Sequence, residues 1–150
     1  MRADFTLYTP EYISGVMSLR KPQKKSLEIL DIIVNSVNLK KGMNLQAALG
    51  AVKALYPTCT DFERDFMSLT FALATGVGKT RLMGAFIAYL YTQHNIKNFF
   101  VVAPNTTIYN KLCRDLNDNN SPKYVFRGLS CFVNAPQVIT GEDYRSKPVS

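Results

Sequence analysis

The segment from Leu73 to Thr80, LATGVGKT, sets the strongest limit on how this chain folds. It follows a short apolar run at 66–74 and opens a run at 79–92 whose apolar residues recur at helical spacing. Gly76 and Gly78 free the backbone to turn N–H groups toward an anion, and the start of the following helix adds unpaired N–H groups. The segment therefore predicts a phosphate-binding loop between a strand and a helix.

The end of this loop carries the side chains that a bound nucleotide needs. Lys79 offers an ammonium group to the β and γ phosphates, and the Thr80 hydroxyl can ligate the Mg²⁺ that accompanies ATP. The common pattern has a glycine where this chain has Leu73, but the flanking strand and helix supply the expected context. The competing interpretation is a glycine-rich turn that happens to precede Lys-Thr. We expect Lys79 and Thr80 to be catalytic, Thr80 to ligate magnesium, and ATP to be bound by Thr75, Gly76, Val77, Gly78, Lys79 and Thr80.

The rest of the chain reads as alternating apolar runs and amphipathic helices. Helical spacing predicts helices at 22–37, 45–55, 79–92 and 106–116, whereas the first twenty residues read as loosely organised. Uncharged apolar runs predict buried strands at 66–74 and 99–104, with shorter candidates at 123–126 and 137–140. This order predicts an α/β fold, a parallel sheet flanked by helices.

Composition narrows the possible functions. The 18 Lys and Arg residues against 11 Asp and Glu residues give a net charge of +7. This charge favours partners that carry phosphate groups, but a basic surface that only contacts solvent is an equal alternative. The 3 cysteines form no Cys-x-x-Cys pair, and His94 is the only histidine, so zinc knuckles and two-histidine metal sites are excluded. Nothing in the sequence is apolar enough for a membrane span or a secretory signal, so we expect a cytoplasmic protein.

Three segments together resemble a known family of motors. LATGVGKT resembles motif I of superfamily 2 helicases and translocases, and FFVVAPNTTIYNKL resembles their motif Ia region. SLRKPQKKSLEIL resembles the Arg-x-x-Gln element that opens these motors, here Arg20 and Gln23. The later stretch KYVFRGLSCFVNAPQVITGEDY is most similar to the restriction subunit of type III systems. The resemblance runs from about residue 18 onward.

The resemblance implies a fold and a function. The fold would be a P-loop NTPase of the RecA-like type, a three-layer arrangement of parallel sheet and helices, of which this chain would hold an incomplete part. Residues 1–150 would be the N-terminal part of the first RecA-like helicase/ATPase domain, with a helical N-terminal segment at 20–56. The function would be the ATP-binding portion of a DNA-dependent ATPase and translocase subunit of a type III restriction endonuclease. ATP and Mg²⁺ are the implied cofactors, and double-stranded DNA and a methyltransferase subunit the implied partners.

The resemblance also implies further site residues. Gln23 would read the adenine edge and Arg20 would pack on the base, although a solvated Gln near a helix start is the simpler alternative for Gln23. The backbone of a nucleic acid strand would be contacted by Pro104, Asn105, Thr106 and Thr107. Plain capping of the next helix by Asn105 or Thr106 is an equal alternative.

Two elements of an ATP-hydrolysing motor are not found in these 150 residues. They are a strand ending in Asp-Glu and an arginine finger. Glu142 and Asp143 follow a run broken by Thr140 and Gly141, so we interpret them as solvated loop residues. We therefore expect catalysis only in a longer parent protein. The alternatives are another superfamily 2 helicase or type I restriction motor, a small-molecule P-loop kinase or NTPase, and a binding module with a degenerate loop.

Overall fold

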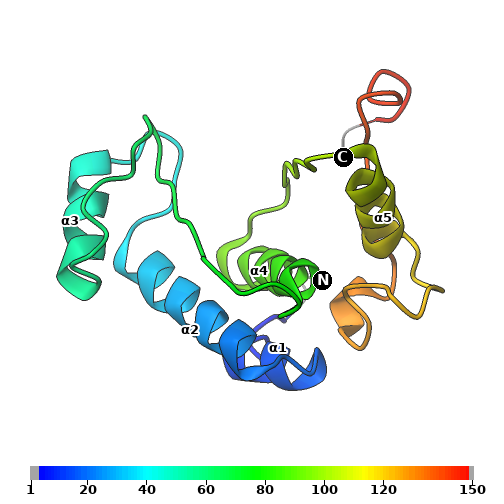
Figure 1. Cartoon of the computed structure of the whole chain (residues 1–150), viewed down its shortest axis with the longest axis horizontal. Helices are drawn as coiled ribbons and strands as arrows, with labels where there is room; N and C mark the ends of the chain where they lie inside the picture. The colour runs from blue at the N-terminus through cyan, green and yellow to red at the C-terminus, as the bar shows by residue number, and fades with distance from the viewer. Residues whose placement is uncertain (1–3, 149–150) are drawn as a thin grey trace.

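The computed structural model describes residues 4–148, and these residues form a helical protein (Figure 1). Within this range there are five α-helices and one short 3₁₀ turn. The helices are α1 (Pro10–Val16), α2 (Lys21–Ser36), α3 (Leu45–Leu55), α4 (Lys79–His94) and α5 (Thr106–Asn117), and the 3₁₀ turn is η1 (Ser130–Phe132). None of the described helices is long and apolar enough to cross a membrane.

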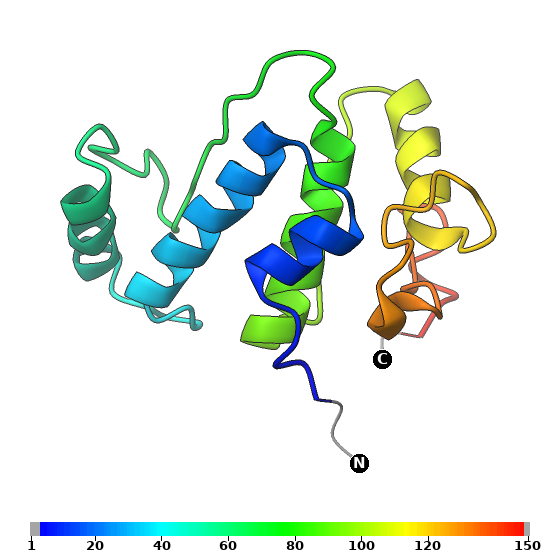
Figure 2. The same cartoon turned by 90° about the horizontal axis from the view of Figure 1, so that it is seen from below.

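The main core lies where α1, α2 and α4 pack together, with α1 lying against both longer helices (Figure 2). From α2 come Leu27, Leu30 and Val34, which are almost fully buried. Facing them, Ala85 and Ala88 of α4 have no exposed surface, and their small side chains let the two helices approach closely. Each large apolar side chain buried here contributes about 1.5–3 kcal/mol. This packing fixes the start of α2 relative to the start of α4.

Two further layers complete the packing. The C-terminal segment adds four buried side chains to the main core: Tyr124, Phe126, Leu129 and Phe132. On the other side of α2, Ile33 packs with Ala48 and Val52 of α3 and with Phe62. The helix α2 thus contributes side chains to two separate clusters.

A partly buried polar contact also joins α2 to α4. The Tyr89 hydroxyl donates to the Asp31 carboxylate, which also accepts a hydrogen bond from Asn35 Nδ2 at 2.8 Å. Because the only hydroxyl proton of Tyr89 is used in this way, His94 Nε2, at 3.0 Å from the Tyr89 oxygen, is the donor in that contact. Burial lowers the pKa of His94. Burial thus favours the neutral form of His94, and its Nε2–H links the end of α4 to Tyr89.

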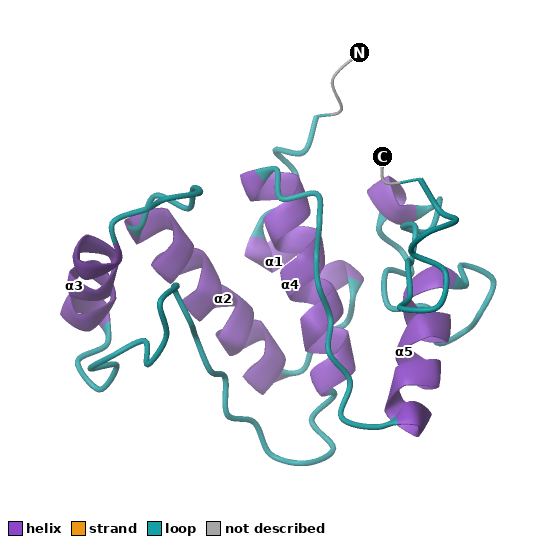
Figure 3. Ribbon diagram, turned by 90° about the horizontal axis from the view of Figure 1, so that it is seen from above, coloured by secondary structure: helices purple, strands orange, loops and turns teal. Residues whose placement is uncertain are grey.

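The predicted α/β fold is wrong for the described residues. No strand is present between residues 4 and 148, so the expected RecA-like three-layer parallel sheet is absent (Figure 3). The segments 66–74 and 99–104 are extended, but each runs alone without a hydrogen-bonded partner strand. Phe100 is 94% exposed and Val102 is 76% exposed, whereas a strand inside a parallel sheet is covered on both faces. The candidates at 123–126 and 137–140 lie in turns and irregular segments.

The helix predictions fared better than the strand predictions. The four helices predicted at 22–37, 45–55, 79–92 and 106–116 are confirmed as α2 to α5, each to within two residues. The prediction that the first twenty residues are loosely organised is wrong, because α1 occupies Pro10–Val16. Its start is fixed by the Thr9 side chain, which accepts a hydrogen bond from Tyr12 N, and by proline in the first turn.

Candidate functional site

The predicted phosphate loop is a turn that leads directly into α4. Gly76 has a φ of 81° and Gly78 a φ of 94°, a backbone conformation that glycine adopts without steric cost. Gly78 is the N-cap of α4, which begins at Lys79. The first N–H groups of a helix have no partner inside the helix, and here they follow a loop that is exposed at Thr75, Gly76 and Gly78. This arrangement is one that can receive an anion.

The first turn of α4 carries the two side chains expected to meet the phosphates. Lys79 is exposed, and among the described residues no carboxylate pairs with its ammonium group. Thr80 follows it and is half-buried. An unpaired ammonium and a hydroxyl at a helix N-terminus fit the phosphates of a nucleotide and the magnesium ion that accompanies them.

The start of α2 lies against the loop. Arg20 Nη1 donates to the Gly76 carbonyl at 3.1 Å, and Gln23 Nε2 donates to the Gly78 carbonyl at 2.8 Å. Gln23 is only 1% exposed, and its Oε1 accepts the backbone N–H of Arg20 at 2.7 Å. Both residues expected from the Arg-x-x-Gln element are thus brought to the glycines of the loop, with their polar groups bonded to the chain itself.

A cavity of about 390 Å³ lies between α2 and the loop. It is lined by Ser18, Arg20, Gln23, Gly76, Val77, Gly78 and Arg81. Thr75, Lys79 and Thr80 do not border it, although Arg81 in the same first turn of α4 does, so the cavity lies beside the groups of Lys79 and Thr80. A larger cavity of about 570 Å³ lies between α2, α3 and the segment 58–72, and it borders none of the residues 73–78.

Sequence reasoning missed two residues of the smaller cavity beside the loop, Arg81 and Ser18. Arg81 donates from Nη1 to the Met17 carbonyl at 2.8 Å, which ties the first turn of α4 to the end of α1. A basic residue right after Lys79 and Thr80 was a signal for a second cation beside the loop. Ser18 has a positive φ of 51°, and nothing in its sequence neighbourhood predicts this conformation.

The predicted nucleic-acid contacts lie at the start of α5, outside this cavity. Asn105 is the N-cap of α5, and its Oδ1 accepts the N–H of Ile108 at 3.0 Å. Pro104, Thr106 and Thr107 are exposed beside it. The capping alternative for Asn105 is therefore confirmed, while the neighbouring hydroxyl groups remain open to solvent.

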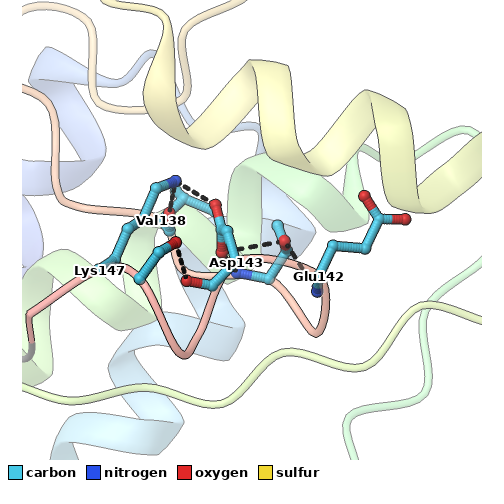
Figure 4. Close-up of polar contacts among 6 residues, drawn as sticks. Val138, Glu142, Asp143 and Lys147 are labelled. Carbon is cyan, nitrogen blue, oxygen red and sulfur yellow. Dashed lines mark hydrogen bonds and ion pairs between the residues drawn. The ribbon is translucent and has the colours of Figure 1, made fainter.

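Of the two acidic residues Glu142 and Asp143, only Asp143 is held within its own turn by its carboxylate (Figure 4). Asp143 Oδ1 accepts the Thr140 N–H at 2.6 Å, and its other oxygen forms an ion pair with Lys147. Lys147 Nζ also donates to the Val138 carbonyl at 3.1 Å. The hydrogen bond from Lys147, followed by that from Thr140, lowers the pKa of Asp143 to about 2. Glu142 is exposed, as expected, whereas Asp143 is half-buried and engaged.

Across residues 4–148, no three His, Cys, Asp or Glu residues come together as metal ligands.

Comparison with known proteins identifies the family. The model of the family described as type III restriction enzyme, res subunit, matches residues 16–146. No curated protein and no solved structure matches the chain. The matched range includes the start of α2, the glycine loop, all of α4 and α5, and the Asp143 turn. The chain therefore belongs to the type III restriction enzyme res subunit family.

Proposed function

We propose that this chain is the ATP-binding part of a motor subunit that uses ATP hydrolysis to move along double-stranded DNA and cleave it. In this proposal, residues 1–150 are the N-terminal part of the first motor domain of such a subunit. The family to which the chain belongs consists of ATP-dependent helicase-like restriction enzymes, which supports the proposal. The second support is the loop at Thr75–Thr80.

The observation that carries the proposal is the conformation of this loop. Two positive φ angles, at Gly76 and Gly78, bring the chain into the N-terminus of α4 with the Lys79 ammonium exposed at its first position. A nucleoside triphosphate matches these groups, because its phosphate oxygens can accept hydrogen bonds from the backbone N–H groups and pair with the Lys79 ammonium at the same time.

Each loop residue then has a defined task. The N–H groups from Thr75 to Thr80 donate to phosphate oxygens, Lys79 compensates the charge on the β and γ phosphates, and the Thr80 hydroxyl ligates magnesium. Magnesium supplies further charge neutralisation when it is bound with ATP. Hydrolysis also needs a magnesium-binding carboxylate, and Asp143 is already paired with Lys147. We therefore assign binding, and not turnover, to these 150 residues.

The start of α5 is the proposed contact with DNA. Pro104, Thr106 and Thr107 are exposed at a helix N-terminus, where small polar groups can contact phosphate oxygens without reading a base. The net charge of +7 adds a general attraction to nucleic acid. In this proposal a methyltransferase subunit is the partner that recognises the DNA sequence.

Nucleotide binding is tested by titrating the chain with ATP and Mg²⁺ in a calorimeter. We expect Lys79→Ala to weaken binding at least tenfold, since a charged contact to phosphate contributes about 1.5–3 kcal/mol. Lys97→Ala is the matched control. Lys97 is exposed beyond the end of α4, away from the loop, and its substitution removes the same positive charge. Equal affinities of the wild type and Lys79→Ala would contradict the assignment.

The DNA part of the proposal is tested separately. We expect the chain to bind a DNA duplex, with an affinity that falls as salt rises and is weakened in the double variant Thr106→Ala, Thr107→Ala. A small-molecule kinase with the same loop would bind MgATP and ignore DNA. Binding of MgATP without any DNA affinity at low salt would favour that alternative over a motor.

A further inference from the structure

Arg81 joins the start of α4 to the end of α1. Its Nη1 donates to the Met17 carbonyl at 2.8 Å. A Cβ atom at Gly78 would lie 4.0 Å from the Arg81 Cβ, so this side chain begins beside the last glycine of the loop. The guanidinium is therefore held at the edge of the predicted phosphate loop by a helix that precedes the loop in the chain.

The acceptor of this contact is placed by the way α1 ends. The N–H groups of Ser18 and Leu19 bond back to carbonyls within α1 at 3.2 and 2.9 Å, and Ser18 has a positive φ of 51°. This pattern is a Schellman motif, which ends a helix at a left-handed residue. The Met17 carbonyl takes part in neither of these bonds. It accepts from Arg81 instead, which places a cation at the negative end of the α1 dipole.

The contact with Met17 uses only part of the guanidinium. An arginine carries N–H groups on three nitrogen atoms, and among residues 4–148 the bonded partner of Arg81 is the Met17 carbonyl. Arg81 is exposed and borders the cavity of about 390 Å³ beside the loop. No carboxylate of the described residues forms an ion pair with it. A guanidinium that is anchored on one side and unpaired on the other fits an anion.

The charge at the start of α4 supports the same conclusion. Lys79 and Arg81 both lie in the first turn, and the sequence of that turn contains no acidic residue. Cations are unfavourable at the positive end of a helix dipole, and like charges so close also repel each other. An anion bound between the two side chains would offset both costs.

The cavity indicates which part of a nucleotide Arg81 meets. Lys79, expected at the β and γ phosphates, does not border the cavity, whereas Arg81 and Gln23 do. Gln23 uses one N–H and one lone pair within the chain and keeps a second of each for a ligand. A nucleotide with its terminal phosphates at Lys79 and its base end in the cavity passes Arg81 with its α-phosphate and ribose. Of these two groups, the α-phosphate is the anion.

We propose that Arg81 binds the α-phosphate of the nucleotide and is held in place for this by the Met17 carbonyl at the end of α1. The proposal rests on the nucleotide-binding function proposed above and deepens it. It also makes the end of α1 part of the nucleotide site, although Val16 is the only residue of this helix inside the family-matched range 16–146.

The first test is calorimetry of the whole chain with ATP and Mg²⁺. Arg81→Ala is expected to weaken binding about tenfold, the loss typical of one charged hydrogen bond. Arg64→Ala is the matched control and should bind as the wild type does. Arg64 is also exposed, and its Nη1 also donates to a backbone carbonyl, that of Glu63 at 2.7 Å, but it borders the larger cavity and not the loop.

The second test is ³¹P NMR of ATP bound at saturation, which resolves the three phosphates. Arg81→Ala should move the resonance of the α-phosphate and leave those of the β and γ phosphates where Arg64→Ala has them. Lys79→Ala should do the reverse. Arg81→Lys covers the case in which Arg81→Ala does not fold, because it keeps the charge and a donor for Met17. It should still move the α-phosphate resonance, since an ammonium replaces the planar fork.

The outcomes separate the two proposals. If Arg81→Ala changes neither the ATP affinity nor the α-phosphate resonance while Lys79→Ala weakens binding, the inference is overturned and the proposed function stands. If the resonances of all three phosphates move together in the Arg81 variants, Arg81 acts through the fold of the loop, which also overturns the inference. If the wild type does not bind ATP, the proposed function fails and the inference fails with it.

Discussion

Gly76 and Gly78 share a positive φ but differ in what surrounds them. A Cβ atom at Gly76 would meet nothing within 4 Å, whereas one at Gly78 would lie 2.5 Å from Gln23 Nε2. We predict that Gly76→Ala destabilises the chain by about 1–2 kcal/mol, the cost of a left-handed alanine. Gly78→Ala is predicted to cost more, because it also displaces Gln23.

Urea unfolding of both variants checks this prediction. Gly50→Ala is the control, since Gly50 lies within α3 with open space around it. Alanine is the better helix former, so this variant should be more stable than the wild type by about 0.5–1 kcal/mol. Equal losses for Gly76→Ala and Gly78→Ala would show that the Gln23 contact does not constrain the loop.

The Asp143 turn gives a prediction about pH. Lys147 and Thr140 lower the pKa of Asp143 from 3.8 to about 2, so the ionised carboxylate is favoured in the folded chain. Its stabilising contribution is fully present above the unfolded pKa near 3.8 and is lost as the pH falls through about 2. In a carboxyl NMR titration, Lys147→Ala should move the pKa of Asp143 up toward 3.8, and Lys97→Ala should not. An unchanged pKa in Lys147→Ala would rule out this ion pair.

At the residue scale, sequence reasoning found the loop but not the contacts of its neighbours. Glycines before Lys-Thr predict a tight turn, because such a turn needs positive φ angles that residues with a Cβ atom rarely adopt. Gln23 and Gly78 are 55 residues apart, so their hydrogen bond depends on how α2 packs on α4. No local pattern encodes that packing, and for this reason the internal contacts of Gln23 could not be predicted.

At the scale of elements, the caps of α3 and α5 are directly comparable. Asn44 accepts the N–H of Ala47 at 3.1 Å, and Asn105 accepts the N–H of Ile108 at 3.0 Å. We predict that Asn44→Ala and Asn105→Ala each lower the free energy of unfolding by about 1 kcal/mol in urea. No loss in Asn105→Ala, with a normal loss in Asn44→Ala, would contradict the assigned cap of α5.

The elements also show why the helix predictions were correct and the strand predictions were wrong. A helix satisfies its own backbone hydrogen bonds, so apolar spacing and caps within one segment are enough to predict it. A strand needs a partner, and the run at 99–104 specifies an apolar segment without specifying what pairs with it. The short α1 was missed because its seven residues offer too little periodicity.

At the scale of the whole molecule, the chain exposes more surface than a compact protein of its mass. Its accessible surface is 10377 Å², whereas a compact monomer of 16.9 kDa exposes about 7,700 Å². Exposed apolar side chains lie along the extended segments, among them Phe66 at 62% and Phe100 at 94%. The helical core therefore carries long, weakly covered connections.

Limited proteolysis with chymotrypsin checks this description. We predict that the first cuts follow Phe66, Phe99 and Phe100, which are exposed and lie outside the helices. Phe126, 1% exposed in the main core, is the internal control and should be cut last. Early cleavage at Phe126 with protection of 95–104 would contradict the arrangement.

The central claim, that Gly76, Gly78 and the start of α4 form a cup for a triphosphate, is tested most directly by NMR of the backbone amides. ATP with Mg²⁺ is titrated into ¹⁵N-labelled chain. The account predicts that the largest shift changes fall on residues 75–82 and that they disappear in Lys79→Ala. Changes centred on α3 or the Asp143 turn, or none at saturating ATP, would contradict it.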